Sequence, residues 1–312
     1  MGHRVLIAAE LEPLLELEQL AGLDVTWLPT DQPTPSGDYV ALVPLLSRWV
    51  GGSELKRLPK LKIVANCAVG HDNVDVVAAE MRRVTVTNTP DILTDATADL
   101  AWALILACAR HVVPGTQLVK SGSWTGWHPE LLLGIELRGR TLGLFGAGRI
   151  GQGVGRRAVP FGMRILYTAR HPRPDFERES GAVRVEFSRL LKESDVLSLH
   201  VPSVPETKGI INDDTLRQMK PGAILINTAH GDLVREEALA QALEAGRLAG
   251  AGLDVYLDEP AIHPGLRAAP RTVLLPHIGS ATLETRRQMA TIAVANVQAV
   301  LKGDRPLTPV FR

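Results

Sequence analysis

The chain has 312 residues, of which 45% are hydrophobic and 22% are charged, as in an ordinary globular protein. Basic and acidic residues number 34 each, so the net charge is zero and nothing in the composition indicates a nucleic-acid or membrane partner. This length suits two domains of ordinary size.

The first third of the chain alternates short apolar runs, typical of buried strands, with helical patterns. We expect strands at 5–8, 24–28, 40–44, 62–67 and 84–88, and helices at 11–20 and 53–58. Such alternation predicts a parallel sheet covered by helices on both faces. A long helix over 93–120 is expected to carry the chain into a second sheet.

The second sheet is expected to begin at Thr141, with further strands at 164–167, 196–201, 223–227, 250–255 and 273–275. A strongly periodic helix over 283–302 follows, is ended by Gly303, and should return to pack on the first domain. The sequence therefore predicts an α/β fold with two doubly wound parallel-sheet domains. The first is discontinuous and formed by 1–97 and 283–312, and the second is formed by 98–282.

The most informative motif is a glycine-rich loop between two predicted strands. Gly146 permits a tight turn, Gly148 lets the backbone approach a pyrophosphate, and Gly151 lets the following helix pack closely on the strand. The phosphates would bind the N–H groups at the helix start, at Arg149 and Ile150. The second domain is therefore a predicted Rossmann cofactor domain, which leaves the first, flavodoxin-like domain to bind the substrate.

The kind of cofactor is predicted from the end of the second strand of this motif, which reads Thr168-Ala169-Arg170-His171-Pro172-Arg173. NAD sites usually have an acidic residue here, and a carboxylate about 4 Å from a 2′-phosphate costs about 4 kcal/mol at an effective dielectric of about 20. Arg170 would instead attract that phosphate through two donors, with Thr168 as a hydroxyl donor and Arg173 assisting. We therefore expect NADP(H). The alternative is that these arginines are solvated surface residues.

Polar or glycine-containing turns follow several predicted strands, where ligands bind in doubly wound folds. Reduction of a ketone needs a proton donor, and His277 ends one strand while Glu259 follows the neighbouring strand and would orient it. Asp254 would accept a hydrogen bond from the nicotinamide carboxamide. The alternatives are a structural turn histidine and a strand-end cap. The other strand-end residues predicted to contact the cofactor are Val201, Pro202, Thr228 and Gly279.

Seven ordered motifs resemble those of the D-isomer-specific 2-hydroxyacid dehydrogenases, and the resemblance covers nearly the whole chain. They are 69–75 (VGHDNVD), 89–95 (TPDILTD), 146–151 (GAGRIG), 219–223 (MKPGA), 226–232 (INTAHGD), 251–255 (AGLDV) and 276–280 (PHIGS). Two further segments, 122–127 and 167–174, look most like those of the NADPH-linked glyoxylate/hydroxypyruvate reductases.

The resemblance implies roles for residues in both domains. His277 matches the acid/base histidine of the family, and Glu259 matches its carboxylate partner. Val69 and Gly70 match the loop whose backbone N–H groups bind the substrate carboxylate, and Leu45 belongs to the pocket loop predicted to bind substrate. Asp254 matches the aspartate beside the nicotinamide in that family.

Trp127, or Trp124, resembles the aromatic residue lent to the pocket of the neighbouring subunit, which implies a homodimer; the alternative is ordinary interface packing. Cys67 and Cys108 lie in apolar surroundings without metal or redox spacing. We therefore expect no metal site and two inert thiols in a reducing compartment. Because the N-terminus shows no signal-peptide pattern, we expect a soluble cytoplasmic protein.

One position departs from the family pattern, because His230 stands where the family has an arginine before the glycine. In the family that arginine binds the carboxylate and carbonyl oxygens of the 2-oxo acid, whereas a histidine offers at most one donor in that direction. Loss of a charged hydrogen bond, worth roughly 1.5–3 kcal/mol, would lower affinity or rate about tenfold to a hundredfold. Three explanations stay open: a different substrate, a protonated His230 that serves in part, and a weakened enzyme.

The sequence as a whole predicts an NADPH-dependent reductase of glyoxylate or hydroxypyruvate to the D-2-hydroxy acid, with His277, Glu259 and His230 as catalytic residues and with turnover impaired at His230. Two other interpretations stay open. One is a cofactor-sensing binding protein on the same fold, which the replaced arginine favours slightly. The other keeps the chemistry but changes the substrate to a bulkier 2-oxo acid or another small anion, with Arg48 as a substitute cation.

Overall fold

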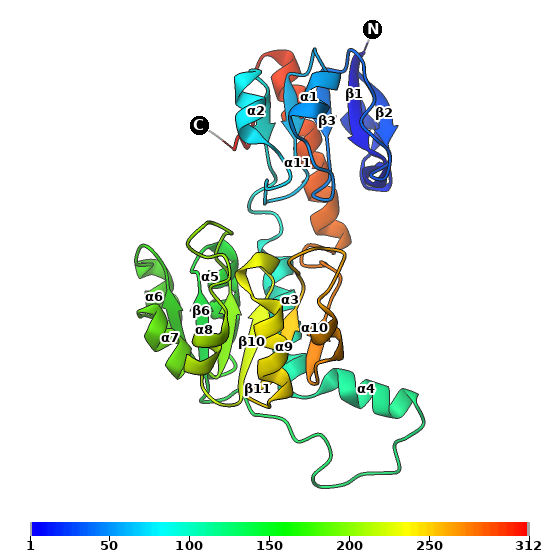
Figure 1. Cartoon of the computed structure of the whole chain (residues 1–312). Coiled ribbons are helices and arrows are strands. Elements are labelled where there is room, and N and C mark those ends of the chain that lie inside the picture. Colours follow the sequence, from blue (N-terminus) through cyan, green and yellow to red (C-terminus); the bar gives the residue numbers. More distant parts are fainter. Residues whose placement is uncertain (1, 311–312) are drawn as a thin grey trace. The chain divides into compact units, whose positions relative to one another are not determined.

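The computed structural model describes residues 2–310, and the chain divides into two compact units (Figure 1). Unit 1 comprises Met1–Leu93 and Ser280–Arg312, and unit 2 comprises Thr94–Gly279. The chain therefore crosses between the units twice, within a few residues of the crossings expected at 97 and 282.

Unit 1 contains a parallel sheet with the strand order β2-β1-β3-β4-β5, which is the flavodoxin-like order. Its strand β1 is buried on both faces, with Val5 and Ile7 in one apolar core and Leu6 in the other. The strands are β1 His3–Ala8, β2 Leu23–Leu28, β3 Ala41–Val43, β4 Ile63–Ala65 and β5 Thr85–Thr87. The helices of this unit are η1 Ala9–Leu14, η2 Leu17–Leu20, α1 Gly52–Arg57, α2 Val76–Met81 and α11 Leu283–Lys302.

The helix α11 begins and ends where the sequence predicts. Its first turn is capped by Thr282, whose Oγ1 accepts a hydrogen bond from the backbone N–H of Thr285 at 3.2 Å. Gly303 ends the helix in the left-handed conformation, at φ 86°. The buried side chains of Ala290 and Ala293 belong to the same core as Val5 and Ile7 of β1, so the helix returns to the first sheet, as expected.

Unit 2 contains a parallel sheet with the strand order β12-β11-β10-β9-β6-β7-β8, and the order reverses between β6 and β9. Ligands bind beyond the carboxyl ends of the strands at such a reversal. Strand β10 alternates between two cores, with Ile224 and Ile226 in one and Leu225 in the other. The strands are β6 Thr141–Phe145, β7 Arg164–Thr168, β8 Val183–Arg184, β9 Val196–Leu199, β10 Ala223–Asn227, β11 Leu248–Leu253 and β12 Thr272–Leu274.

Helices cover both faces of this second sheet. Buried residues of α3, α5 and α6 belong to the core that contains Ile224, and buried residues of α7 to α10 belong to the core that contains Leu225. The helices are α3 Thr94–Ala109, α4 Val112–Lys120, α5 Arg149–Ala158, α6 Pro174–Ser180, α7 Phe187–Glu193, α8 Asp213–Gln218, η3 Gly231–Leu233, α9 Glu236–Glu244 and α10 Pro264–Ala268. The fold is thus α/β with two doubly wound parallel sheets, as predicted.

Two helices expected from the sequence were wrong. Residues 11–20 form parts of the short 3-10 helices η1 and η2, because the backbone between them is extended at Leu15 and Glu16. The helix expected over 93–120 is broken near His111, which takes a left-handed backbone at φ 52°, and α3 and α4 are bent by 65°. Pro114 and Gly115 follow the break, in the first turn of α4, where a proline is tolerated. The two-residue strand β8 is too short to give a pattern.

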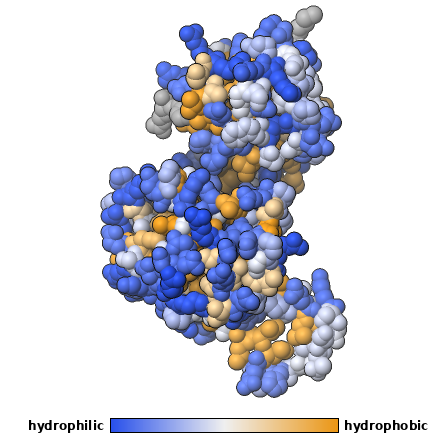
Figure 2. All heavy atoms as spheres, viewed as in Figure 1, coloured by the Kyte–Doolittle hydropathy of each residue, from blue (hydrophilic) through white to orange (hydrophobic). Residues whose placement is uncertain are grey.

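Unit 2 also has an extended segment, residues 112–136, made of α4 and the loop that follows it. Its exposed large apolar side chains are Val112, Val119, Trp124, Trp127, Leu131, Leu132 and Leu133. Figure 1 shows this segment leaving the sheet of unit 2, and Figure 2 shows hydrophobic residues gathered on it. Within residues 2–310 no single helix is long and apolar enough to cross a membrane, and α3 with α4 reach that length only as a bent pair.

Candidate active site

The glycine-rich loop joins β6 to α5, and the structure gives a separate reason for each glycine. Gly146 has φ 104°, and a Cβ there would lie 2.4 Å from the carbonyl oxygen of His200 at the end of β9. A Cβ at Gly151 would lie 2.2 Å from the carbonyl oxygen of Gly146. A Cβ at Gly148 would meet no atom within 4 Å, so the backbone at the start of α5 borders open space. That space fits a phosphate at the N-terminus of this helix.

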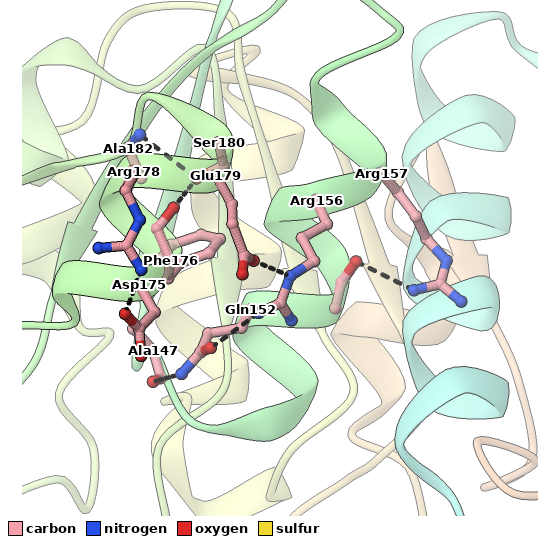
Figure 3. Close-up of polar contacts among 11 residues, drawn as sticks. Ala147, Gln152, Arg156, Arg157, Asp175, Phe176, Arg178, Glu179, Ser180 and Ala182 are labelled. Carbon is pink, nitrogen blue, oxygen red and sulfur yellow. Dashed lines mark hydrogen bonds and ion pairs between the residues drawn. The ribbon is translucent and has the colours of Figure 1, made fainter.

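Side chains hold the carbonyl group of Ala147 in this loop. It accepts hydrogen bonds from Gln152 Nε2 and from Arg173 Nε, each at 3.0 Å. Gln152 Oε1 in turn accepts a bond from Arg156 Nη2 at 3.4 Å, and Arg156 Nε donates to Glu179 Oε2 at 2.9 Å. Figure 3 shows this chain of contacts running from the loop along α5 to α6. Arg173 lies between β7 and α6, and its side chain therefore holds the glycine-rich loop in place.

The end of β7 presents Arg170 as an exposed side chain. Thr168 differs from the expectation, because its Oγ1 donates to the carbonyl oxygen of Val185 at 2.7 Å. A hydroxyl has one proton to donate, so Thr168 does not offer it to a cofactor here. Arg184, which the sequence did not single out, donates from Nε to the carbonyl of Ala169 at 3.0 Å and from Nη2 to the carbonyl of Arg170 at 3.2 Å.

The end of β9 lies against the same loop. Val201 is half-buried, and its Cγ1 would be 2.9 Å from a Cβ placed at Gly146. The carbonyl group of Pro202 accepts a hydrogen bond from Thr207 Oγ1 at 2.7 Å, which fixes the exposed turn after the strand. Both residues thus follow the strand that stands beside β6 at the reversal of strand order.

The ends of β11 and β12 bring His277 and Glu259 together, as their positions in the sequence predict. His277 Nδ1 lies 2.7 Å from Glu259 Oε2, and Glu259 Oε1 accepts a bond from the backbone N–H of Tyr256 at 3.0 Å. Burial alone would raise the pKa of Glu259, but the bonds from His277 and Tyr256 hold it below its usual value. Glu259 is therefore ionised at neutral pH and orients the imidazole.

His277 has a left-handed backbone, with φ 55°, in a turn that Asp254 holds. This conformation costs a residue other than glycine on the order of 1 kcal/mol, and it is common at functional sites. Asp254 Oδ1 accepts the N–H of Ile278, and its Oδ2 accepts the N–H of Gly279, both at 2.7 Å. Asp254 is 1% exposed, and this burial raises its pKa although the two N–H bonds oppose the change. A Cβ at Gly279 would lie 3.2 Å from Asp254 Oδ2.

The loop after β10 carries His230 and is packed tightly in unit 2. A Cβ at Gly231 would lie 1.9 Å from the carbonyl atoms of Tyr256, so the loop lies directly against the segment that precedes Glu259. The carbonyl group of His230 accepts a bond from Asn227 Nδ2 at 2.8 Å. The ends of β10, β11 and β12 thus place His230, Asp254, Glu259 and His277 at one edge of the sheet.

Thr228, in the same loop, has a hydroxyl that a ligand would complete. Its side chain is buried, with 8% exposed, and within the described part of the chain its Oγ1 has no hydrogen-bond partner. A buried hydroxyl without a partner is costly, so this atom fits contact with a bound group.

The substrate residues expected in unit 1 follow β3 and β4. Val69 and Gly70 are half-buried, and their carbonyl groups accept bonds from Asn88 Nδ2 at 2.8 Å and Asn66 Nδ2 at 2.9 Å. The carbonyl of Leu45 accepts a bond from Asn73 Nδ2 at 3.2 Å. None of these asparagines was predicted from the sequence, because an isolated asparagine gives no signal of its burial.

Arg48 cannot serve as the substitute cation considered from the sequence. Its side chain is 7% exposed, its Nη2 donates to the carbonyl of Pro29 at 2.6 Å, and its Nη1 lies 3.4 Å from Thr34 Oγ1. Burial lowers its pKa, although Glu10 and other acidic groups oppose that change. The guanidinium is a structural group that fixes the loop after β2.

The two cysteines are buried in apolar surroundings. Burial raises the pKa of Cys67 and that of Cys108 to about 12, so neither thiol forms the reactive thiolate near neutral pH. Within residues 2–310, no group of three or more His, Cys, Asp or Glu side chains is arranged to hold a metal ion. Trp127 is 83% exposed on the extended segment, and Trp124 is 53% exposed.

Comparison with known proteins finds relatives that match most of the chain. A family profile described as the NAD binding domain of the D-isomer specific 2-hydroxyacid dehydrogenases matches residues 102–279. A glyoxylate reductase of Thermococcus litoralis is 50% identical over 270 residues, which are 85% of this chain and 82% of that protein.

Solved structures extend the likeness to both units. A protein of Thermus thermophilus is 45% identical with a TM-score of 0.90, over 98% of this chain and 99% of that one. An NADPH-dependent glyoxylate/hydroxypyruvate reductase of Sinorhizobium meliloti, solved with NADP and malonate, is 35% identical with a TM-score of 0.88, over 100% and 97%. The chain described here therefore belongs to the D-isomer-specific 2-hydroxyacid dehydrogenase family.

Proposed function

We propose that this protein is an NADPH-dependent reductase that converts small 2-oxo acids, chiefly glyoxylate and hydroxypyruvate, to D-2-hydroxy acids. The observation that carries the proposal is the 2.7 Å contact between His277 Nδ1 and Glu259 Oε2. That pair is a proton donor with its orienting carboxylate. The glyoxylate reductase of T. litoralis supports the substrate class, and the NADPH-dependent enzyme of S. meliloti supports the cofactor.

Unit 2 has groups that fit a dinucleotide. The open space beside Gly148 and the unsatisfied Oγ1 of Thr228 are the two observations that support binding there. When bound, NADPH supplies the hydride that reduces C2 of the substrate. The residues proposed to hold it are Gly146, Gly148, Arg149, Ile150, Gly151, Val201, Pro202, Thr228, Asp254 and Gly279, with Arg170 binding the 2′-phosphate. Thr168 is proposed to border the cofactor at the end of β7, but its hydroxyl proton is donated to the carbonyl of Val185 and is not offered to the cofactor.

The proton that completes the reduction comes from His277. Its Nδ1 bonds to Glu259, so Nε2 is the nitrogen proposed to donate to the carbonyl oxygen of the substrate. Glu259 fixes the tautomer and stabilises the charged imidazolium before transfer. Asp254 keeps the turn in place through Ile278 and Gly279, so that the imidazole starts from a fixed backbone.

The substrate is proposed to bind through its carboxylate. In unit 1 the backbone N–H groups of Val69 and Gly70 are proposed to donate to its oxygens, with Leu45 in the same pocket loop region. In unit 2 His230 is proposed to offer one further donor. A single imidazole donor replaces the forked guanidinium of the family, so we expect weaker binding of ordinary 2-oxo acids than a forked donor gives.

A steady-state screen tests this function. Glyoxylate, hydroxypyruvate and bulkier 2-oxo acids are offered with NADPH and with NADH to the wild-type chain and to His277→Ala. Turnover of glyoxylate with NADPH that disappears in the variant supports the proposal. Tight NADPH binding without turnover of any small 2-oxo acid would reject it and favour a cofactor-sensing protein, which the histidine at 230 makes the second candidate.

We also propose that the protein is a homodimer that uses the extended segment. Seven exposed large apolar side chains on residues 112–136, with Trp127 at 83% exposure, are unusual for a surface in water. Light scattering after size-exclusion chromatography measures the mass directly. A monomer that keeps full activity would reject the dimer and the role of Trp127 in a neighbouring pocket.

A further inference from the structure

The two loops of unit 1 that are proposed to bind the substrate meet at a buried pair of side-chain amides. Asn66 Nδ2 donates to Asn73 Oδ1, and Asn73 Nδ2 donates to Asn66 Oδ1, both at 3.0 Å. Asn66 is 0% exposed and Asn73 is 8% exposed. Because both groups are neutral, the pair avoids the desolvation penalty that a buried ion pair would carry.

The remaining amide hydrogens of this pair bind main-chain carbonyl groups of both loops. Asn66 Nδ2 also donates to the carbonyl of Gly70 at 2.9 Å. Asn73 Nδ2 also donates to the carbonyls of Arg48 at 3.0 Å and Leu45 at 3.2 Å. An amide has two N–H donors, so the donors of Asn66 are fully used and one of those of Asn73 is shared.

Each carbonyl from residue 68 to residue 70 therefore has a partner. The carbonyl of Ala68 accepts the backbone N–H of Thr89 at 2.9 Å, that of Val69 accepts Asn88 Nδ2 at 2.8 Å, and that of Gly70 accepts Asn66 Nδ2. We call Asn66, Asn73 and Asn88 the amide frame. Its side chains bond the carbonyls of Val69 and Gly70, so it holds two successive peptide groups of the loop in place.

The orientation of those carbonyls sets the direction of the N–H groups. In a planar trans peptide, the C=O of one residue and the N–H of the next point in opposite directions. The bonds from the frame to the carbonyls of 69 and 70 therefore turn the N–H groups of Gly70 and His71 away from those asparagines. Both residues are half-buried.

We propose that the amide frame positions the N–H groups of Gly70 and His71 for the carboxylate of the substrate, and that it couples this loop to Leu45. The asparagines are positioning residues that do not touch the substrate, and the inference rests on the proposed function of the chain. It adds His71 N–H to the anion-binding groups. It also predicts that loss of the frame weakens binding of 2-oxo acids while NADPH binding in unit 2 is unchanged.

The test uses Asn66→Ala and Asn73→Ala, separately and together, with Gln298→Ala as the control. Gln298 lies on α11 in unit 1, and its Nε2 donates to the carbonyl of Gln19 in η2 at 2.7 Å, so its amide supports a main-chain carbonyl of another segment. Kinetics with glyoxylate and NADPH are measured for each variant, together with the melting temperature.

We expect Asn66→Ala to raise the KM for glyoxylate about tenfold to a hundredfold, because small displacements of positioning groups have effects of this size. The KM for NADPH should stay within about twofold of wild type. The double variant should lose less than the product of the two single losses, because the two amides bond to each other. Gln298→Ala should lower the melting temperature without raising the KM for glyoxylate. Equal rises in Asn66→Ala and Gln298→Ala would overturn the frame.

A second measurement separates failure of the frame from failure of the proposed function. Hydrogen exchange of a peptide that covers residues 69–75 reports on the loop without any turnover. Exchange should be faster in Asn66→Ala and in the less buried Asn88→Ala than in Gln298→Ala; equal exchange in all three overturns the frame. If the wild-type chain reduces no 2-oxo acid while exchange changes as expected, the proposed function fails. In that case the asparagines order the loop, but the role of the loop in substrate binding is rejected.

Discussion

The sheet edge of unit 2 has two regions that are built from different kinds of group. Around β6 and β7 the edge presents backbone groups and the exposed side chain of Arg170, with Arg184 and Arg173 bonding the carbonyls behind them. Around β11 and β12 it presents two carboxyl groups whose pKa values are shifted in opposite directions. The pKa of Glu259 is lowered and that of Asp254 is raised. In the proposed function, one sheet thus keeps phosphate recognition apart from proton transfer.

This separation means that substitutions in the two regions should have different signatures. Changes beside β7 should alter which cofactor is used and leave the chemical step intact. Changes beside β11 and β12 should alter turnover or its pH dependence and leave cofactor affinity intact.

The largest effect should come from His277→Ala. Removing a general acid costs about a hundredfold to ten-thousandfold in rate, so kcat with glyoxylate should fall at least about a hundredfold. Fluorescence titration should show unchanged NADPH affinity. His263→Ala is the control, because that histidine caps α10 through Gly265 in the same unit and should leave kcat unchanged. Retained turnover in His277→Ala would remove its proton-donor role.

The next effect should come from Arg170→Ala. Loss of a charged hydrogen bond to the 2′-phosphate, worth roughly 1.5–3 kcal/mol, should lower kcat/KM for NADPH about tenfold to a hundredfold. Values for NADH should stay nearly constant. Arg178→Ala is the control, since that arginine pairs with Asp175 on the surface of α6. If wild type uses both cofactors equally well, Arg170 does not select between them.

A gain should follow from His230→Arg. The forked guanidinium offers two donors to a 2-oxo acid where an imidazole offers one, so kcat/KM for glyoxylate should rise about tenfold. The measurement is the same steady-state assay with a series of 2-oxo acids. Unchanged or lower values would show that the native substrate has another shape or charge.

The smallest effect concerns pH and Glu259. The folded-state pKa of Glu259 lies below its unfolded value, so its contribution to stability is present above the unfolded pKa and is lost as pH falls through the folded pKa. Glu259→Gln should therefore be less stable than wild type near neutral pH, and the difference should shrink in acid. Because the carboxylate is 33% exposed, we expect no more than about 1 kcal/mol. Thermal unfolding at several pH values measures it, and a difference that grows in acid would contradict the ion pair.

The sequence predicted those parts of the site that depend on local pattern. The glycine-rich loop is recognisable because each glycine answers a backbone requirement within a few residues. The meeting of Glu259 and His277 follows from parallel strands, since residues after neighbouring strands end at the same sheet edge. Helix α11 is recognisable because Thr282 and Gly303 mark its two ends.

The remaining parts depend on contacts that a linear pattern does not contain. Arg184 supports the end of β7 only because the two-residue strand β8 pairs beside it. Thr168 was assigned as a donor from its position, whereas its proton is used by Val185, which lies on a later segment. Arg48, Asn66 and Asn73 are ordinary polar residues in sequence, and only the folded chain shows that they are buried.

The tight fit of Gly231 against Tyr256 has a consequence for how this active site can change. Because the main chain at Gly231 has no room to shift, we expect the backbone of residue 230 to stay in place when its side chain is replaced. A library that varies residue 230 alone should therefore retune which anions are reduced while most of its members still fold. We expect a single substitution at residue 230 to change the substrate range, whether it arises in evolution or by engineering.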